Sequence, residues 1–318
     1  MPTLFEKLQD ASIVSSFDQT GYIRHQRHFT TSDMDVDLTG KTILITGANS
    51  GIGFATSVAL ATKGATVYLL CRNPERGQQA EDKIRELTGS DTVHFHRLDL
   101  SDLNQVRLSA EQLLQKVENI DVFVHNAGIL PVKEMRSTQN HELTLATNLL
   151  GHHLLTRLLW ERLTGRMILV SSGGMYMAPL STNKLFTTTF SKFDGVERYA
   201  LTKRAQVALA EMWSIKGKKQ GLVVHSMHPG WVATPGVEHS LPGFWKRMEN
   251  RLRTPEEGAD TVVWLACAEK ATQSTGKFWF DREPRKTHIL PWQSHTTKEQ
   301  QKLWTALEST VAPHLSPS

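Results

Sequence analysis

The chain has 318 residues, of which 39% are hydrophobic and 21% charged, a composition typical of a soluble globular protein with a buried core. Its 36 basic and 32 acidic residues leave a net charge of +4, which mildly favours anionic ligands but is too small and dispersed for nucleic-acid binding. Cys71 and Cys267 lie far apart in the sequence, so a disulfide framework is not expected and a reducing, cytoplasmic setting is favoured.

Residues 1–38 are a polar N-terminal extension without the basic and apolar stretches of a secretory signal. A loose amphipathic pattern runs through Leu4, Phe5, Leu8, Ile13 and Phe17. We expect a surface helix that packs on the domain; a membrane or partner contact is the alternative. No apolar run approaches the roughly 18 residues that a spanning helix needs.

From Lys41 onward, short apolar runs rich in β-branched residues alternate with segments of helical period, which predicts βαβ units. We expect strands at Thr42–Thr46, Thr66–Cys71, Val93–Leu98, Asp121–His125, Met167–Ser171, Leu222–Met227 and Lys277–Phe280. Helices are expected at about 52–63, 75–88, 102–118, 139–163, 198–216 and 255–268. The predicted α/β fold is one doubly wound, seven-stranded parallel sheet of the Rossmann type over residues 39–282.

The first predicted strand runs into a glycine-rich turn and then a helix. Such glycines let the backbone approach a pyrophosphate, while the helix start offers free N–H groups to negative charge. A ligand-free turn is the alternative, but the βαβ context favours a dinucleotide site. The candidate contacts are Gly47, Asn49, Ser50, Gly51, Ile52 and Gly53.

Two further positions bear on the cofactor. Arg72 stands at the end of the second predicted strand, where an NAD site usually carries a carboxylate. An arginine there pairs with a 2′-phosphate, so we expect NADP(H) to be preferred over NAD(H); a solvated strand-end arginine is the alternative. Asp99 follows the third strand and either reaches the adenine amine or forms a turn or helix cap.

Tyr199 and Lys203 are four residues apart in a helical segment, so both project from one face. A nearby ammonium stabilises a phenolate and lowers its pKa, as a proton donor for a carbonyl/alcohol pair requires. Ser172 ends the fifth strand, at the sheet edge where ligands bind in such folds, and Ser171 competes for that role. Taken alone, the Tyr–Lys pair is a common surface arrangement.

Residues 283–318 form a C-terminal extension with a basic, proline-containing loop and a helix. Leu303, Trp304, Leu307 and Val311 keep helical spacing and are expected to dock on the domain. Among the fourteen histidines, His94 and His96 face one side of a strand without a third ligand, so we expect no metal site.

These motifs together resemble the short-chain dehydrogenase/reductase family over roughly residues 39–282. The shared features are the TGxxxGxG run, Asn126-Ala127-Gly128, Asn148, the serine-ended strand, Tyr199xxxLys203 and Pro229-Gly230xxxThr234. The resemblance implies that the protein is an enzyme that transfers a hydride between nicotinamide and a carbonyl or alcohol.

The resemblance also implies roles for individual residues. Tyr199 would be the acid/base, Lys203 would lower its pKa and bind the nicotinamide ribose, and Ser172 would orient the carbonyl. Asn148 would help to hold a proton-relay water. Further cofactor contacts would come from Asn126, Ala127, Gly128, Pro229, Gly230, Val232 and Thr234, with Thr234 at the carboxamide.

Two departures from the family pattern stand out. His125 replaces the first asparagine of the usual Asn-Asn-Ala-Gly. The segment between Ser172 and Tyr199 is longer than in many members, so Leu180–Asp194 must loop out, where it either shapes the substrate mouth or covers the site.

Apolar residues near the expected mouth, together with the resemblance, favour an apolar substrate such as a lipid aldehyde, retinoid or steroid. These residues are Met175, Met177, Trp231, Leu241 and Phe244. The alternative is a catalytically idle NADP(H)-binding regulator or scaffold. A peripheral membrane contact through residues 1–38 and 241–253 is compatible with either, and so is the homodimer that family members often form through the helices near 102–163 and 198–216.

Overall fold

A computed structural model describes residues 13–315 of the chain, with side chains from Ser15 onward. Its strands form one sheet in the order β3-β2-β1-β4-β5-β6-β7-β8, parallel from β3 to β7. The strands are β1 (Thr42–Thr46), β2 (Thr66–Cys71), β3 (Val93–Arg97), β4 (Ile120–His125), β5 (Leu163–Val170), β6 (Val223–Met227), β7 (Phe278–Phe280) and β8 (Glu283–Arg285).

The predicted Rossmann-type α/β sheet is confirmed, but the count of seven strands is one short. The additional strand, β8, folds back antiparallel on β7 through Asp281 and Arg282, which take the left-handed φ values of 48° and 59°. Sequence patterning misses it because the strand is short, carries Pro284 and lies at the sheet edge, where a proline is tolerated.

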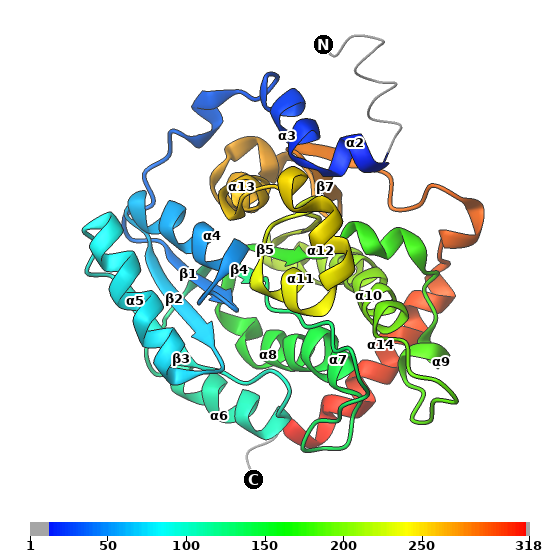
Figure 1. The fold of residues 1–318 in the computed structure, drawn as a ribbon. Coiled ribbons are helices and arrows are strands. Elements are labelled where there is room, and N and C mark those ends of the chain that lie inside the picture. Colours follow the sequence, from blue (N-terminus) through cyan, green and yellow to red (C-terminus); the bar gives the residue numbers. More distant parts are fainter. Residues whose placement is uncertain (1–12, 316–318) are drawn as a thin grey trace.

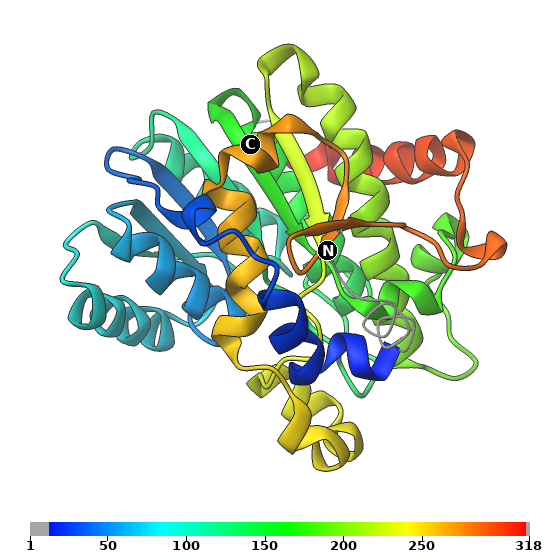
Figure 2. The same ribbon diagram turned by 90° about the horizontal axis from the view of Figure 1, so that it is seen from above.

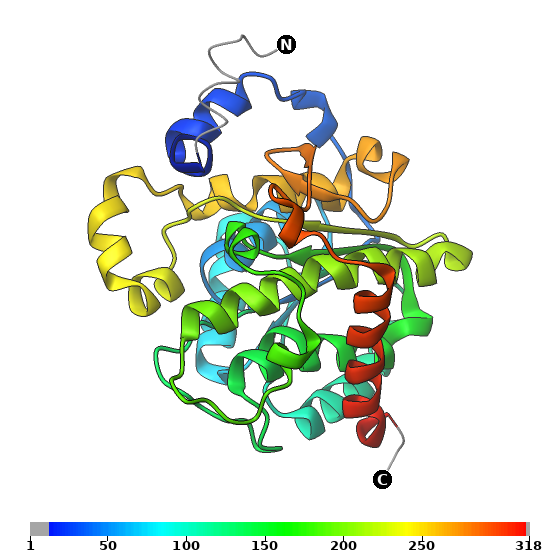
Figure 3. The ribbon, with the colours of Figure 1, turned by 90° about the vertical axis from the view of Figure 1, so that its right-hand side faces the viewer.

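Helices cover both faces of the sheet (Figures 1 and 3). On one face lie α4 (Gly51–Thr62), α5 (Pro74–Thr88) and α13 (Pro255–Cys267), and on the other α6 (Leu103–Leu114), α8 (Gly151–Leu159) and α10 (Gly195–Lys216). Alternate residues of β1 enter the two cores: Ile43 and Ile45 pack under the first set and Leu44 under the second. The near-continuous apolar strands are explained by this double covering.

The helix expected over 139–163 is shorter and interrupted. It begins at α7 (Leu143–Leu145), because the Glu142 carboxylate accepts hydrogen bonds from the backbone N–H groups of Thr144 and Leu145 at 2.7 and 3.1 Å. A π-helical turn, Ala146–Leu150, then leads into α8. Such a turn inserts one residue into the helix and is frequent at functional sites.

Both extensions pack on this core. Helices α2 (Ile13–Phe17) and α3 (Gln19–Gln26) lie over β7 and beside α13 (Figures 1 and 2), and Phe17 is buried. The rest of the amphipathic pattern, Leu4, Phe5, Leu8 and the Ile13 side chain, lies outside the described residues. At the other end, α14 (Thr297–Val311) buries Leu303, Trp304, Leu307 and Val311. None of the helices between residues 13 and 315 is long and apolar enough to cross a membrane.

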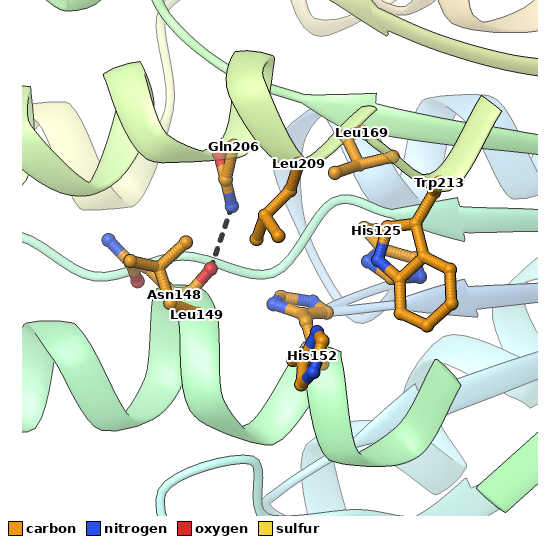
Figure 4. Close-up of a pocket in the computed structure, with 9 residues that line it drawn as sticks. His125, Asn148, Leu149, His152, Leu169, Gln206, Leu209 and Trp213 are labelled. Atoms are coloured by element: carbon orange, nitrogen blue, oxygen red, sulfur yellow. Dashed lines mark hydrogen bonds between the residues drawn. The ribbon is translucent and has the colours of Figure 1, made fainter. Parts of the chain in front are cut away.

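Two histidines are stacked in the core where β4 meets α8. The His125 and His152 rings lie 4.8 Å apart at 15° (Figure 4). The Thr46 hydroxyl accepts the backbone N–H groups of Asn126 and Ala127 at 3.0 and 2.9 Å, which occupies both of its lone pairs. The same hydroxyl lies 3.0 Å from His152 Nε2 and 3.4 Å from the Val124 carbonyl, so it joins the His152 ring to β1 and β4.

Burial lowers the pKa of His152 to about 3, and burial likewise holds the pKa of His125 well below its ordinary value. Between these values and about 6.5, the unfolded chain binds more protons than the folded chain. The free energy of unfolding therefore falls as the pH drops below about 6.5, by about 1.4 kcal/mol per pH unit for each such histidine.

We predict that His125→Asn makes this loss of stability shallower by about 1.4 kcal/mol per pH unit between roughly pH 6 and pH 4.5, because one buried titrating group is removed. Urea unfolding of both proteins across this range measures the two slopes, with pH 7.5 as the reference. Equal slopes would show that His125 does not titrate as a buried neutral group.

Candidate active site

The candidate residues meet at the edge of the sheet where β1, β4, β5 and β6 end. A Cβ atom added to Gly128 would lie 3.2 Å from Lys203 Nζ and 3.5 Å from Asn148 Oδ1. A Cβ atom added to Gly51 would lie 3.1 Å from Thr234 Cγ2. The structure thus brings the glycine turn, the segment after β4, the α10 lysine and the loop after β6 into one place, the usual ligand site of open α/β sheets.

The glycine turn fits a dinucleotide. Gly47 and Gly51 have φ values of 65° and 54°, in the region that favours glycine. A Cβ atom on Gly53 would come within 2.5 Å of Asn126 Nδ2, so only glycine lets the helix start approach this closely. The Ser50 side chain does not cap α4, which leaves the first N–H groups of that helix available to a pyrophosphate.

Asn126 stabilises the glycine turn through its side-chain amide. Its side-chain amide donates to the carbonyls of Thr46 and Gly47 at 2.9 and 3.2 Å. Thr46, through its hydroxyl, joins this segment to β1 and to His152. The sequence analysis did not predict this structural role of the Thr46 hydroxyl, although Thr46 is the first residue of the glycine motif.

The structure separates the two competing serines. The Ser171 hydroxyl is buried and donates to the Lys203 carbonyl at 2.8 Å, so it fixes α10 against β5. The Ser172 hydroxyl accepts the Gly174 N–H at 3.1 Å, and a Cβ atom added to Gly174 would lie 3.5 Å from Ser172 Oγ and 3.8 Å from Tyr199 Cε1. Ser172 is therefore the serine that faces Tyr199.

Tyr199 and Lys203 lie one turn apart on α10. Lys203 Nζ is 5.3 Å from the centre of the Tyr199 ring and donates to the Val170 carbonyl at 2.8 Å. Burial lowers the pKa of Lys203 to about 7. Burial also raises the pKa of Tyr199, and its hydrogen bond with Ser172 counteracts part of that rise. The two groups are close enough for each to stabilise the charge of the other.

Asn148 lies in the π-helical turn with every polar group engaged. Its Oδ1 accepts the Ile129 N–H at 2.9 Å, and its Nδ2 donates to the Ile129 carbonyl and to Thr202 Oγ1, both at 3.1 Å. Its backbone carbonyl accepts Gln206 Nε2 at 2.9 Å (Figure 4). Nothing in the sequence pattern pointed to Gln206 except its position about one helical turn after Lys203.

The outer cofactor candidates differ in their surroundings. Arg72 is exposed after β2, and its side chain makes no hydrogen bond or ion pair with any residue in the range 13–315. Asp99 Oδ1 accepts the N–H and the hydroxyl of Ser101 at 2.9 and 2.6 Å, so Asp99 forms a turn. Its contact with adenine remains a prediction.

The loop after β6 carries the remaining cofactor candidates. Gly230 has a φ of 80°, and the Thr234 hydroxyl accepts the Val237 N–H at 3.3 Å to cap α11 (Pro235–Ser240). Val232 is buried against Gly258, where a Cβ atom would lie 2.6 Å from Val232 Cγ2, so its side chain packs on α13. Pro229 precedes the glycine and accepts a hydrogen bond from Arg253 at 3.4 Å.

The long segment between Ser172 and Tyr199 is fastened beside the site. It contains α9 (Thr182–Leu185), whose Leu185 carbonyl accepts Arg198 at 2.7 Å. Arg198 is itself buried and pairs with Glu142 at 3.0 Å. The segment thus links the start of α10 to the start of α7.

One of the residues that the sequence analysis predicts at the mouth of the substrate site lies elsewhere. Met175 is fully buried and packs with Val207 and Phe278, so its assignment to the mouth is wrong. Met177 is exposed, and the Trp231 and Phe244 rings pack edge to face at 5.2 Å. Period alone could not separate these methionines, because they lie in one short 3₁₀ turn.

No three His, Cys, Asp or Glu side chains within residues 13–315 are grouped so as to hold a metal ion. The residues present fit a nucleotide cofactor instead: a turn that only glycines permit, an uncapped helix start and a buried lysine converge at one edge of the sheet.

Comparison with known proteins agrees with this geometry. Residues 41–242 match the family model described as short chain dehydrogenase. The chain is 38% identical over 301 residues to human dehydrogenase/reductase SDR family member 12, covering 92% of this chain and 93% of that protein. It is 32% identical over 281 residues to human retinol dehydrogenase 12, covering 85% and 86%.

Among solved structures, an uncharacterised protein from Mycobacterium paratuberculosis superposes with a TM-score of 0.72 at 25% identity, covering 89% of this chain and 97% of that one. This fold binds nicotinamide cofactors. The chain therefore belongs to the short-chain dehydrogenase/reductase family, as an oxidoreductase acting on CH–OH or C=O groups.

Proposed function

We propose that the protein is an NADP(H)-dependent oxidoreductase that interconverts the carbonyl and alcohol forms of an apolar substrate. The observation that supports this most strongly is the convergence of Ser172, Tyr199 and Lys203 beside the glycine turn. Residues 39–282 form the domain that carries this site. The nicotinamide supplies the hydride when the cofactor is bound.

Side chains of the protein donate and accept the proton that is exchanged with the substrate oxygen. In reduction, Ser172 donates a hydrogen bond to the substrate carbonyl oxygen, and the Tyr199 hydroxyl transfers its proton to that oxygen as the carbonyl carbon is reduced. The products are the alcohol and the Tyr199 phenolate, which the Lys203 ammonium stabilises. Asn148, whose side chain is bonded within the protein, holds the π-helical turn beside Lys203. Oxidation runs the same steps in reverse.

The apolar substrate is supported by the surface around the site and by the relatives. Trp231 and Phe244 form an aromatic pair in and after the loop that follows β6, and Met177 is exposed next to the Ser172 turn. A relative that covers most of the chain is named for retinol, an apolar alcohol. We propose a lipid aldehyde, retinoid or steroid as the substrate class.

Tyr199→Phe removes the transferable proton while it keeps the ring. We expect NADPH oxidation, measured against a panel of aldehydes, ketones and quinones, to fall by about 10²-fold or more, with NADPH affinity retained. Turnover that survives in Tyr199→Phe would contradict the role of Tyr199. If both proteins bind NADPH and neither turns over any substrate, the idle regulator is the better interpretation.

The preference for NADP(H) rests on Arg72, whose exposed guanidinium has no partner among the described residues and is free to pair with a 2′-phosphate. We expect Arg72→Glu to raise the dissociation constant for NADPH by about 10-fold or more, because it replaces attraction by repulsion. The constant for NADH should change little. Arg76→Glu, an exposed site on α5, is the matched control.

Fluorescence titration of wild type and both variants with each nucleotide measures these constants. Equal losses of NADPH affinity in the two variants would show a general charge effect and would contradict the assignment of Arg72 to the 2′-phosphate.

A further inference from the structure

We propose that residues 15–25, in the N-terminal extension, are a structural part of the active site, in which Phe17 positions both the Ser172 turn and the cofactor loop after β6. This inference rests on the proposed function for the roles of those two loops. It concerns how they are held, and Phe17 is a positioning residue because it acts through them.

Phe17 fills the space on one side of the Ser172 turn. A Cβ atom on Gly173 would lie 2.5 Å from Phe17 Cε2, so position 173 has no room for a side chain while the ring is there. A Cβ atom on Gly174 would instead face Ser172 Oγ at 3.5 Å and Tyr199 Cε1 at 3.8 Å. The turn therefore has the reacting groups on one side and Phe17 on the other.

The same residue contacts the loop after β6. The Phe17 carbonyl accepts the Trp231 N–H at 2.8 Å, as a strand partner would. Its ring lies 4.4 Å from the buried His228 ring, whose Nδ1 accepts the Gly230 N–H at 3.2 Å. One side chain and one carbonyl thus fix the backbone at both Gly230 and Trp231.

Arg253 fastens the residues on either side of Phe17. Its guanidinium is fully buried and donates to the carbonyls of Ser16, Asp18 and Pro229 at 2.9, 3.2 and 3.4 Å. A single cation therefore bonds both the N-terminal segment and the first residue of the cofactor loop.

The charge of Arg253 is balanced by Asp281. The Asp281 carboxylate receives two hydrogen bonds from Arg253, at 2.6 and 2.9 Å, and lies 2.6 Å from His25 Nδ1. Asp281 follows β7, and His25 belongs to α3, so the ion pair connects the sheet to the extension as well. Removing either partner of a buried ion pair leaves an unpaired charge in the protein interior and strongly destabilises the fold. The Arg253–Asp281 pair therefore holds the N-terminal segment in place.

Loosening this segment should release two functional loops together. The Ser172 turn would lose its support opposite Tyr199, and the loop that leads to Thr234 would lose the bond to Trp231. A displacement of about 1 Å at reacting groups can cost about 10²-fold in rate. Cofactor affinity and turnover should therefore both depend on Phe17, which acts through these two loops.

The test compares Phe17→Ala with Phe17→Leu and with Leu307→Ala. Leu307 is fully buried in α14, away from both loops, so Leu307→Ala controls for a general loss of stability. The readouts are hydrogen–deuterium exchange of residues 228–234 without cofactor, NADPH affinity by fluorescence, and kcat and KM with a carbonyl substrate that wild type reduces. The first two do not require turnover.

In Phe17→Ala we expect exchange over residues 228–234 to accelerate by about 10-fold and kcat/KM to fall by about 10-fold or more, with weaker NADPH binding. Phe17→Leu should restore most of each property, and Leu307→Ala should leave all three near wild type. If Phe17→Ala does not fold, Gly173→Ala displaces the ring from the opposite side and should give the same pattern.

The inference is overturned if the Phe17 variants change exchange and NADPH affinity no more than Leu307→Ala does. Failure of the proposed function gives a different result, because wild type itself would then bind no NADPH or would bind it without reducing any carbonyl substrate.

Discussion

The buried ammonium of Lys203 is the constraint on which the site depends. The ammonium lies between the Val170 carbonyl, the backbone of Gly128 and the Tyr199 ring. The backbone carbonyl of Lys203 accepts a hydrogen bond from Ser171, which holds this part of α10 in position. A buried cation is stabilised by a nearby negative charge, and the Tyr199 phenolate is the adjacent group that can carry one. Burial raises the pKa of Tyr199 and lowers that of Lys203, so each charge forms most readily when the other is present.

Both extensions serve this arrangement from outside the Rossmann sheet. At the N-terminal end, Phe17 holds the turn and the loop that flank the lysine, and Arg253 of the core domain binds the carbonyls of Ser16 and Asp18 beside it. At the C-terminal end, Tyr176 donates to the Lys286 carbonyl at 2.6 Å, and the buried Gln293 donates to the Tyr176 carbonyl. The Ser172–Met177 turn is therefore supported from two distant parts of the chain, which a shorter form of the fold would not provide.

The sheet and the positions of the motifs could be predicted from the sequence, because apolar runs and glycine motifs are local signals. The π-helical turn, the support of Asn148 by Gln206 and the packing of Phe17 on Gly173 could not, since each depends on contacts between residues far apart in the chain. The burial of Met175 is unpredictable for the same reason, because it depends on packing against Val207 and Phe278. The different roles of Ser171 and Ser172 depend on α10, because Ser171 binds the Lys203 carbonyl and Ser172 lies beside Tyr199.

The most direct test of the central claim is the tyrosinate absorbance of the NADP⁺ complex as a function of pH. Subtracting the spectrum of Tyr199→Phe isolates Tyr199 from the other tyrosines, and Lys203→Met removes the ammonium. The account predicts that the Tyr199 phenolate appears at a lower pH in wild type than in Lys203→Met, because the ammonium stabilises the phenolate. A phenolate that forms at the same pH in both proteins would contradict it.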